Sequence, residues 1–65
     1  MRVFSCFVRH RRSSTPVLSF VLARDEHRAR ALARRQLADT PDALAIEIFE
    51  NDQLIAVMSA EGARS

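Results

Sequence analysis

Several residue types that mark familiar classes of protein are missing or scarce in this chain. Its 65 residues include no lysine, no tryptophan, no tyrosine, one glycine and one cysteine. A single cysteine cannot form an internal disulfide, so the chain is not one of the disulfide-stapled small secreted domains. The only glycine lies at position 62, which excludes a glycine-rich loop that cradles phosphate.

Long hydrophobic runs are also missing. No apolar stretch approaches the roughly 18–20 residues of a membrane span, and the segment Met1–Val8 lacks the length and the cleavage site of a secretory signal. We therefore expect no membrane partner and a cytoplasmic location. What is present is typical of a folded protein, because 48% of the residues are hydrophobic and 28% are charged. The length suits one small domain.

All ten basic residues are arginines, and they are unevenly distributed. Residues 1–24 carry five arginines and no acid, whereas residues 42–65 carry five acids and one arginine. This asymmetry is consistent either with ordinary solvated surface or with one basic and one acidic face. A basic face suits nucleic acid, an acidic protein or the acidic half of a second copy. Arginine without lysine, beside ten alanines, is also typical of the coding bias of a GC-rich genome.

The first and last thirds of the chain each predict a pair of strands. β-branched and aromatic residues over 2–9 and an apolar run over 17–23 predict the first hairpin, with a polar loop at 10–16. Residues 44–50 and 53–59 predict the second, and the two residues between them form its turn. With a two-residue turn, Glu50 opposes Gln53, Ile48 opposes Ile55, and Ile46 opposes Val57.

A helix is predicted between the hairpins. Asp25 is a good N-cap, Glu26 suits the first turn, and no glycine or proline lies between Glu26 and Ala38. Thr40 precedes Pro41, so the helix ends near Asp39, although Thr40 and Pro41 also suit one extra helical turn. The stripe at helical spacing comprises Ala29, Leu32, Ala33, Gln36 and Leu37.

The predicted order is ββαββ. We expect a single α+β domain over residues 1–60, in which one helix packs on one face of a four-stranded, mainly antiparallel sheet. Residues 61–65 are expected to be a frayed tail. The order of the strands in the sheet stays open.

One helix covers only one face of such a sheet. To that face we assign Phe4, Cys6, Val8, Leu18, Phe20, Leu22, Ile46, Ile48, Ile55 and Val57. The uncovered face then carries Val3, Phe7, Val17, Val21, Phe49, Leu54 and Met58, mixed with Ser5, Ser19 and Glu47. If the two faces of the first strand are assigned the other way round, Phe4 takes the place of Phe7 and the uncovered face stays equally apolar. A solvated antiparallel face is normally polar.

The apolar face predicts an interaction module that forms a homodimer or binds a protein partner there. Pairing of exposed strand edges is a second route to a dimer. The alternative is a monomer whose apolar face is exposed to water or is covered by the 10–16 loop and the tail.

Catalytic and metal-binding patterns are missing from the sequence. Cys6 lies in a strand, His10 in a loop and His27 in a helix, without the spacing of a zinc site or a nucleophile–base pair. The neighbouring acids are explained by the helix cap and the hairpin turn. We expect no enzymatic activity, no metal, no cofactor and no small-molecule substrate.

Arginines supply the second functional hypothesis, nucleic-acid binding. Their forked guanidinium groups bind phosphate well, and phosphate contacts dominate nucleic-acid affinity. The sequence lacks the aromatic segments of an RRM and the GXXG loop of a KH domain. The candidate phosphate-binding residues are Arg9, Arg11 and Arg12 in and beside the loop, and Arg28, Arg34 and Arg35 on the helix.

Two segments carry a family resemblance. The helix opening Asp25-Glu-His-Arg-Ala-Arg-Ala-Leu-Ala33 and the hairpin Ile46-Glu-Ile-Phe-Glu-Asn-Asp-Gln-Leu-Ile55 resemble small uncharacterised ββαββ proteins of proteobacteria. The resemblance covers about half the chain. It implies a bacterial protein of the same fold, and it assigns no functional residue.

Overall fold

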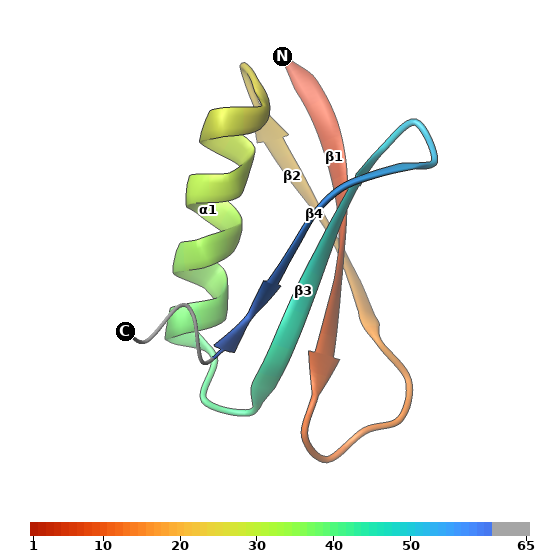
Figure 1. Cartoon of the computed structure of the whole chain (residues 1–65), viewed down its shortest axis with the longest axis vertical. Coiled ribbons are helices and arrows are strands. Elements are labelled where there is room, and N and C mark those ends of the chain that lie inside the picture. The colour runs from red at the N-terminus through yellow and green to blue at the C-terminus, as the bar shows by residue number, and fades with distance from the viewer. Residues whose placement is uncertain (61–65) are drawn as a thin grey trace.

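The computed structural model describes residues 1–60 and has four strands and one helix in the order ββαββ (Figure 1). The elements are β1 (Arg2–His10), β2 (Val17–Ala23), α1 (Glu26–Asp39), β3 (Ala43–Glu50) and β4 (Gln53–Ser59). The predicted α+β fold is confirmed, and the strand ends agree with the predicted ones to within one residue. The tail expected at 61–65 lies outside the described residues.

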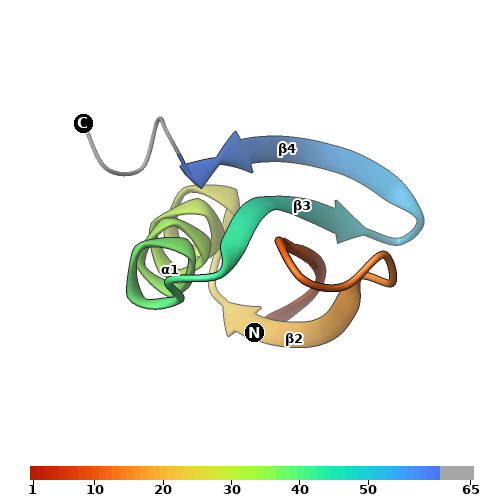
Figure 2. The same cartoon turned by 90° about the horizontal axis from the view of Figure 1, so that it is seen from below.

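The four strands form one open sheet in the order β2-β1-β3-β4, and every neighbouring pair is antiparallel. The two central strands therefore come from different hairpins. Helix α1 packs against one side of this sheet, and no other element of residues 1–60 covers the opposite side (Figure 2). We call the two sides the helix face and the open face.

Helix α1 begins and ends at the predicted residues. The Asp25 carboxylate accepts a 2.8 Å hydrogen bond from the backbone N–H of Arg28, which satisfies one of the free donors of the first turn. Thr40 has extended backbone angles (φ −112°, ψ 100°), as expected before a proline, so α1 ends at Asp39. Residues 40–43 form a single turn, in which the backbone N–H of Ala43 donates a 3.1 Å hydrogen bond to the carbonyl of Thr40, and no further helix follows it. Its hydroxyl donates a 2.8 Å hydrogen bond to the carbonyl of Gln36.

The second hairpin closes with the predicted two-residue turn. Asn51 and Asp52 both have positive φ, at 51° and 67°. This combination is that of the type I′ turn, whose twist matches the flanking strands, and Asn and Asp are the non-glycine residues that tolerate it best. The loop of the first hairpin is joined to the α1–β3 connection, because the backbone N–H of Arg11 donates to the carbonyl of Asp42 at 2.8 Å.

The core lies between α1 and the helix face. The helix contributes small residues, Ala29 and Ala33, together with Leu37, and all three are buried. Small side chains bring the helix close to the sheet but fill little volume, so most of the core volume comes from the two central strands. The buried residues are Phe4, Cys6, Val8, Ala23, Ala29, Ala33, Leu37, Ala43, Ile46, Ile48 and Ala60.

The predicted facing of β2 is wrong. Cys6 opposes Ser19 and Phe4 opposes Val21 in the β1–β2 ladder, and directly opposed residues point to the same side of a sheet. The small residues of β2 therefore lie on the helix face, where the alanine-lined helix comes close. The bulky residues Leu18, Phe20 and Leu22 lie on the open face, with exposed fractions of 48%, 65% and 62%.

The predicted facing of β4 is wrong only after Ile55: Leu54 and Ile55 lie on the predicted faces, whereas Val57 and Met58 are exchanged. Glu50 opposes Gln53 as predicted, but the register shifts by one residue between Ile48 and Phe49. After this β-bulge, Ile48 opposes Ala56 and Ile46 opposes Met58. A one-residue slip exchanges the two faces of a strand, so Met58 packs on the core and Val57 is exposed on the open face. Ile55, beside the bulge, still packs against the core.

Candidate functional site

The open face presents two rows of side chains that run across all four strands. Following the ladders from β2 to β4, the first row is Phe20, Ser5, Phe49 and Leu54. The second row is Leu18, Phe7, Glu47 and Val57. A third, shorter row pairs Leu22 with Val3. Only one of these ten side chains is charged.

Much of this apolar surface is in contact with water. The most exposed large side chains of the open face are Val3, Leu18, Phe20, Leu22, Leu54 and Val57. An aromatic side chain alone buries roughly 150–250 Å², so six side chains about half exposed leave on the order of 500 Å² of apolar surface in water. This area reaches the size of the largest apolar patches of monomeric proteins, about 300–600 Å², which are often functional.

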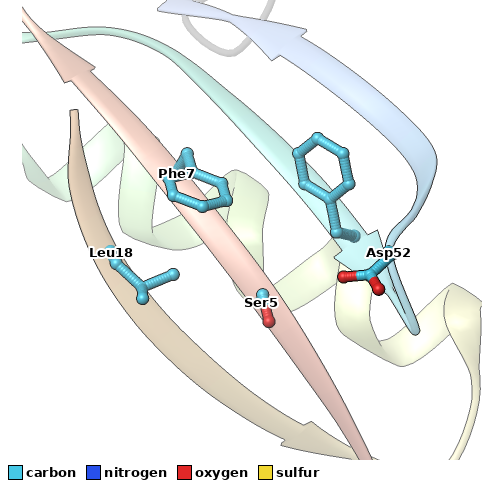
Figure 3. A pocket seen from close by; sticks show the side chains of 5 residues that line it. Ser5, Phe7, Leu18 and Asp52 are labelled. Carbon is cyan, nitrogen blue, oxygen red and sulfur yellow. The ribbon is translucent and has the colours of Figure 1, made fainter.

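A hollow of ≈ 240 Å³ opens in the middle of this face. It lies above the small residue Ser5 and is lined by Phe7, Leu18, Phe49 and Asp52 as well (Figure 3). The rings of Phe7 and Phe49 form its wall in an edge-to-face pair, with centroids 5.6 Å apart and planes at 90°. The hollow exists because the flanking strands carry large side chains on either side of a serine.

Few charges interrupt the open face, and two of them neutralise each other. A guanidinium nitrogen of Arg9 lies 3.8 Å from a carboxylate oxygen of Glu47. Asp52, in the hairpin turn, places its carboxylate at the rim of the hollow and has no ion pair with another residue of the 1–60 range. The centre of the face therefore combines apolar side chains with little net charge.

The interface residues predicted from sequence divide between the two faces. Four of them lie on the open face: Val3, Phe7, Phe49 and Leu54. The other three, Val17, Val21 and Met58, point to the helix face, because of the facing of β2 and the bulge in the β3–β4 ladder. Sequence reasoning missed Leu18, Phe20, Leu22 and Val57.

The six candidate phosphate-binding arginines do not form one surface. Arg9 pairs with Glu47, and Arg35 lies 3.8 Å from Asp39 one turn further along α1. Arg11 and Arg12 belong to the β1–β2 loop, which is well separated from α1 in both views (Figures 1 and 2). The remaining two, Arg28 and Arg34, are exposed on the helix.

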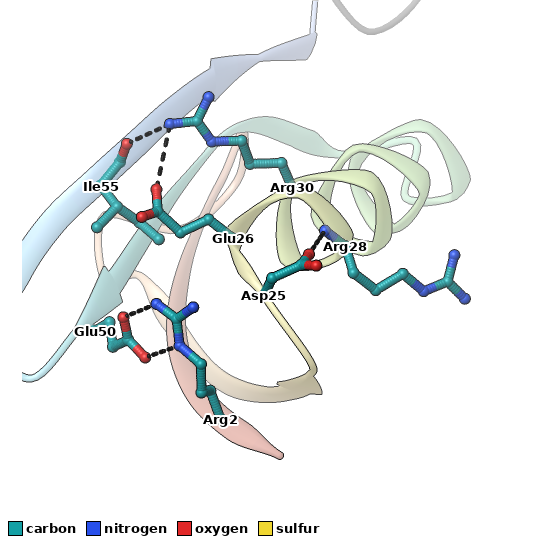
Figure 4. Close-up of polar contacts among 7 residues, drawn as sticks. All are labelled: Arg2, Asp25, Glu26, Arg28, Arg30, Glu50 and Ile55. Carbon is teal, nitrogen blue, oxygen red and sulfur yellow. Dashed lines mark hydrogen bonds and ion pairs between the residues drawn. The ribbon is translucent and has the colours of Figure 1, made fainter.

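A polar cluster at the start of α1 ties the two hairpins together (Figure 4). Arg2 donates two hydrogen bonds to Glu50, from Nε at 2.8 Å and from Nη2 at 2.5 Å. This hydrogen-bonded pair lowers the pKa of the Glu50 carboxyl and raises that of Arg2. Arg30 lies 3.6 Å from Glu26 and donates a 3.1 Å hydrogen bond to the carbonyl of Ile55. All four side chains have internal partners, so this cluster is structural.

Neither reactive nor metal-binding groups converge among the described residues. Cys6 is fully buried, and desolvation raises the pKa of its thiol. Residues 1–60 contain no group of three His, Cys, Asp or Glu side chains close enough to share a metal ion. Over the same residues, no helix has both the length and the apolar character needed to cross a membrane.

Comparison of the chain with protein-family models, with curated proteins and with solved structures finds no match in any of the three. The resemblance to proteobacterial ββαββ proteins therefore stays a prediction.

Proposed function

We propose that this protein is a small, non-enzymatic interaction module that associates with a second copy of itself through the open face of its sheet. The observation that carries the proposal is the facing of β2. The bulkiest residues of this strand, Leu18, Phe20 and Leu22, point to water, while its small residues point to the core. A second surface that covers the outer side of this strand removes these apolar side chains from water, which is the main favourable contribution to association.

The available area supports a dimer. Two open faces packed together remove about 1,000 Å² of apolar surface from water, which is about the smallest area that a specific interface buries. A domain this small and without a disulfide has a small core of its own, so burial of further apolar surface in a dimer adds a large share of its stability. Sheets that pack face to face lie about 10 Å apart with their side chains interdigitated, so the helices of both copies would remain on the outside.

Sedimentation equilibrium across the micromolar range tests this proposal. The expected species at high concentration has twice the 7.4 kDa mass of the chain. Leu22→Glu places a carboxylate in the interface and should weaken association by at least about 100-fold, because a buried unpaired charge costs several kcal/mol. The matched control is Ala38→Glu, on the exposed side of α1, which should dimerise like the parent. A parent protein that stays at 7.4 kDa throughout would refute the proposal.

A second candidate, nucleic-acid binding, is supported by the arginines that lack an acidic partner. Arg11, Arg12, Arg28 and Arg34 form no ion pair with any acid of residues 1–60. Their separation into a loop group and a helix group argues against one continuous phosphate-binding surface. Fluorescence anisotropy with labelled DNA and RNA at ~50 and ~200 mM salt distinguishes the candidates, since phosphate contacts weaken steeply over this range. Dimerisation through an apolar face should respond little.

A further inference from the structure

We propose that the hollow above Ser5 is a binding site for an aromatic ring, and that its occupant is the Phe20 side chain of a second copy. This inference rests on the proposed function and specifies how the two open faces meet. Within one chain, the hollow and an exposed aromatic ring lie side by side on the open face. Ser5 and Phe20 are directly opposed in the β1–β2 ladder, so the hollow and the most exposed ring of the face are neighbours.

The hollow has the size and the lining that a phenyl ring requires. An engineered apolar cavity of about 150 Å³ binds benzene, and this hollow measures ≈ 240 Å³. Its walls are Leu18 and the edge-to-face rings of Phe7 and Phe49, which offer an incoming ring further edge-to-face contacts. Phe20 of the same chain is 65% exposed and is not part of the lining, so it does not fill the hollow beside it.

A twofold dimer makes use of this arrangement, because an isologous interface needs a surface that complements itself. In the row Phe20–Ser5–Phe49, the serine lies midway between the two aromatic residues. A twofold axis that lies in the interface along β1 carries β2 of each copy over β3 of the other. Phe20 of each copy then faces Phe49 and the hollow of the other, and the small side chain of Ser5 at the axis permits close approach.

The charges of the face are compatible with this packing. Arg9 and Glu47 already form a pair within each copy, so no unpaired charge of this pair is buried. Asp52 belongs to the exposed hairpin turn and stays at the rim of the hollow. The dimer that results is a sandwich of two sheets, with β2, β1 and β3 in the interface and β4 toward its margin.

Complementary variants test the inference. Phe20→Ala removes the ring, and Ser5→Leu fills the hollow. Each variant alone should weaken self-association by at least about 100-fold, because both symmetry-related contacts are lost. In a 1:1 mixture, Phe20 of the Ser5→Leu chain can enter the open hollow of the Phe20→Ala chain. The filled hollow of the Ser5→Leu chain then faces the alanine at position 20 of the other chain, where no ring has to be accommodated. Native mass spectrometry, which separates the two chains by mass, should therefore show a heterodimer within about tenfold of the parental affinity.

The control is Ser5→Ala, which leaves the hollow open and should dimerise like the parent. Circular dichroism melts of each chain establish that it is folded. Three results overturn the inference. A parent protein that is monomeric refutes the proposed function as well. A Ser5→Leu chain that still dimerises shows that the copies meet elsewhere, for example by pairing of β2 edges. Loss of dimerisation without rescue in the mixture leaves the open face as the interface and refutes the insertion of Phe20.

Discussion

The buried hydroxyl of Ser19 provides a direct test of the packing on the helix face. Its Oγ has no hydrogen-bond partner among residues 1–60, and it lies beside the fully buried Cys6 in the β1–β2 ladder. Leaving a buried hydroxyl unpaired costs about 1–3 kcal/mol. Ser19→Ala removes this cost and gives up the packing of a single atom. We expect a net gain of about 1 kcal/mol in the free energy of unfolding, or about 4–8 °C in Tm for a domain of this size.

Urea denaturation followed by circular dichroism measures this change. The protein concentration is held constant, because association would otherwise couple stability to concentration. Ser14→Ala, in the exposed β1–β2 loop, is the matched control and should leave the midpoint unchanged. A loss of more than about 0.5 kcal/mol in Ser19→Ala would show that the hydroxyl forms a stabilising hydrogen bond, and would refute the reasoning.

Three further predictions concern the cap, an ion pair and the core. Asp25→Ala, which loses the bond to the Arg28 amide, should lower the free energy of unfolding by about 1 kcal/mol, while Asp25→Asn should retain most of it. Because Arg2 lowers the pKa of Glu50, this carboxylate stabilises the fold above its unfolded pKa of about 4.3 and ceases to do so as the pH falls through the lower folded value. Urea midpoints of Glu50→Gln should therefore fall less steeply with acidification than those of the parent, and parallel profiles would contradict the pairing. The Cys6 thiol should react with a disulfide reagent at least about 1,000-fold more slowly in the native protein than in urea, and equal rates would contradict its burial.

The elements of the fold were predictable because their signals are local. Asp25 begins α1, Thr40 ends it before a proline, and Asn51–Asp52 forms the turn that its residue types favour. Each signal depends on a few neighbouring residues whose backbone preferences are strong. The apolar character of the open face was also predictable, because both faces of the sheet are apolar and one helix covers only one of them.

Which residues occupy each face was only partly predictable. Alternation assigns the faces of a strand when one side is polar, but β2 (Val17–Ala23) is apolar on both sides, so its facing depends on the β1–β2 register and on how close an alanine-lined helix comes. The bulge in the β3–β4 ladder has no recognisable signal in the sequence, because Leu54 and Ile55 are both apolar and either suits a buried position. The candidate site depends on these two tertiary choices, and for this reason sequence reasoning missed Phe20.

The position of β1 at the centre of the sheet has a consequence for how the chain folds. Its two neighbours are β2 and β3. Strand β2 follows β1 after a short loop, whereas β3 begins more than thirty residues after β1 ends, and α1 lies between them in the sequence. The Arg2–Glu50 pair joins residues separated by 48 positions. Helix α1 packs against both hairpins, so the core is complete only when the helix and both hairpins are in place. We therefore expect the two halves to fold together in one cooperative step, and fragments cut between β2 and α1 to form the complete core only when they are mixed.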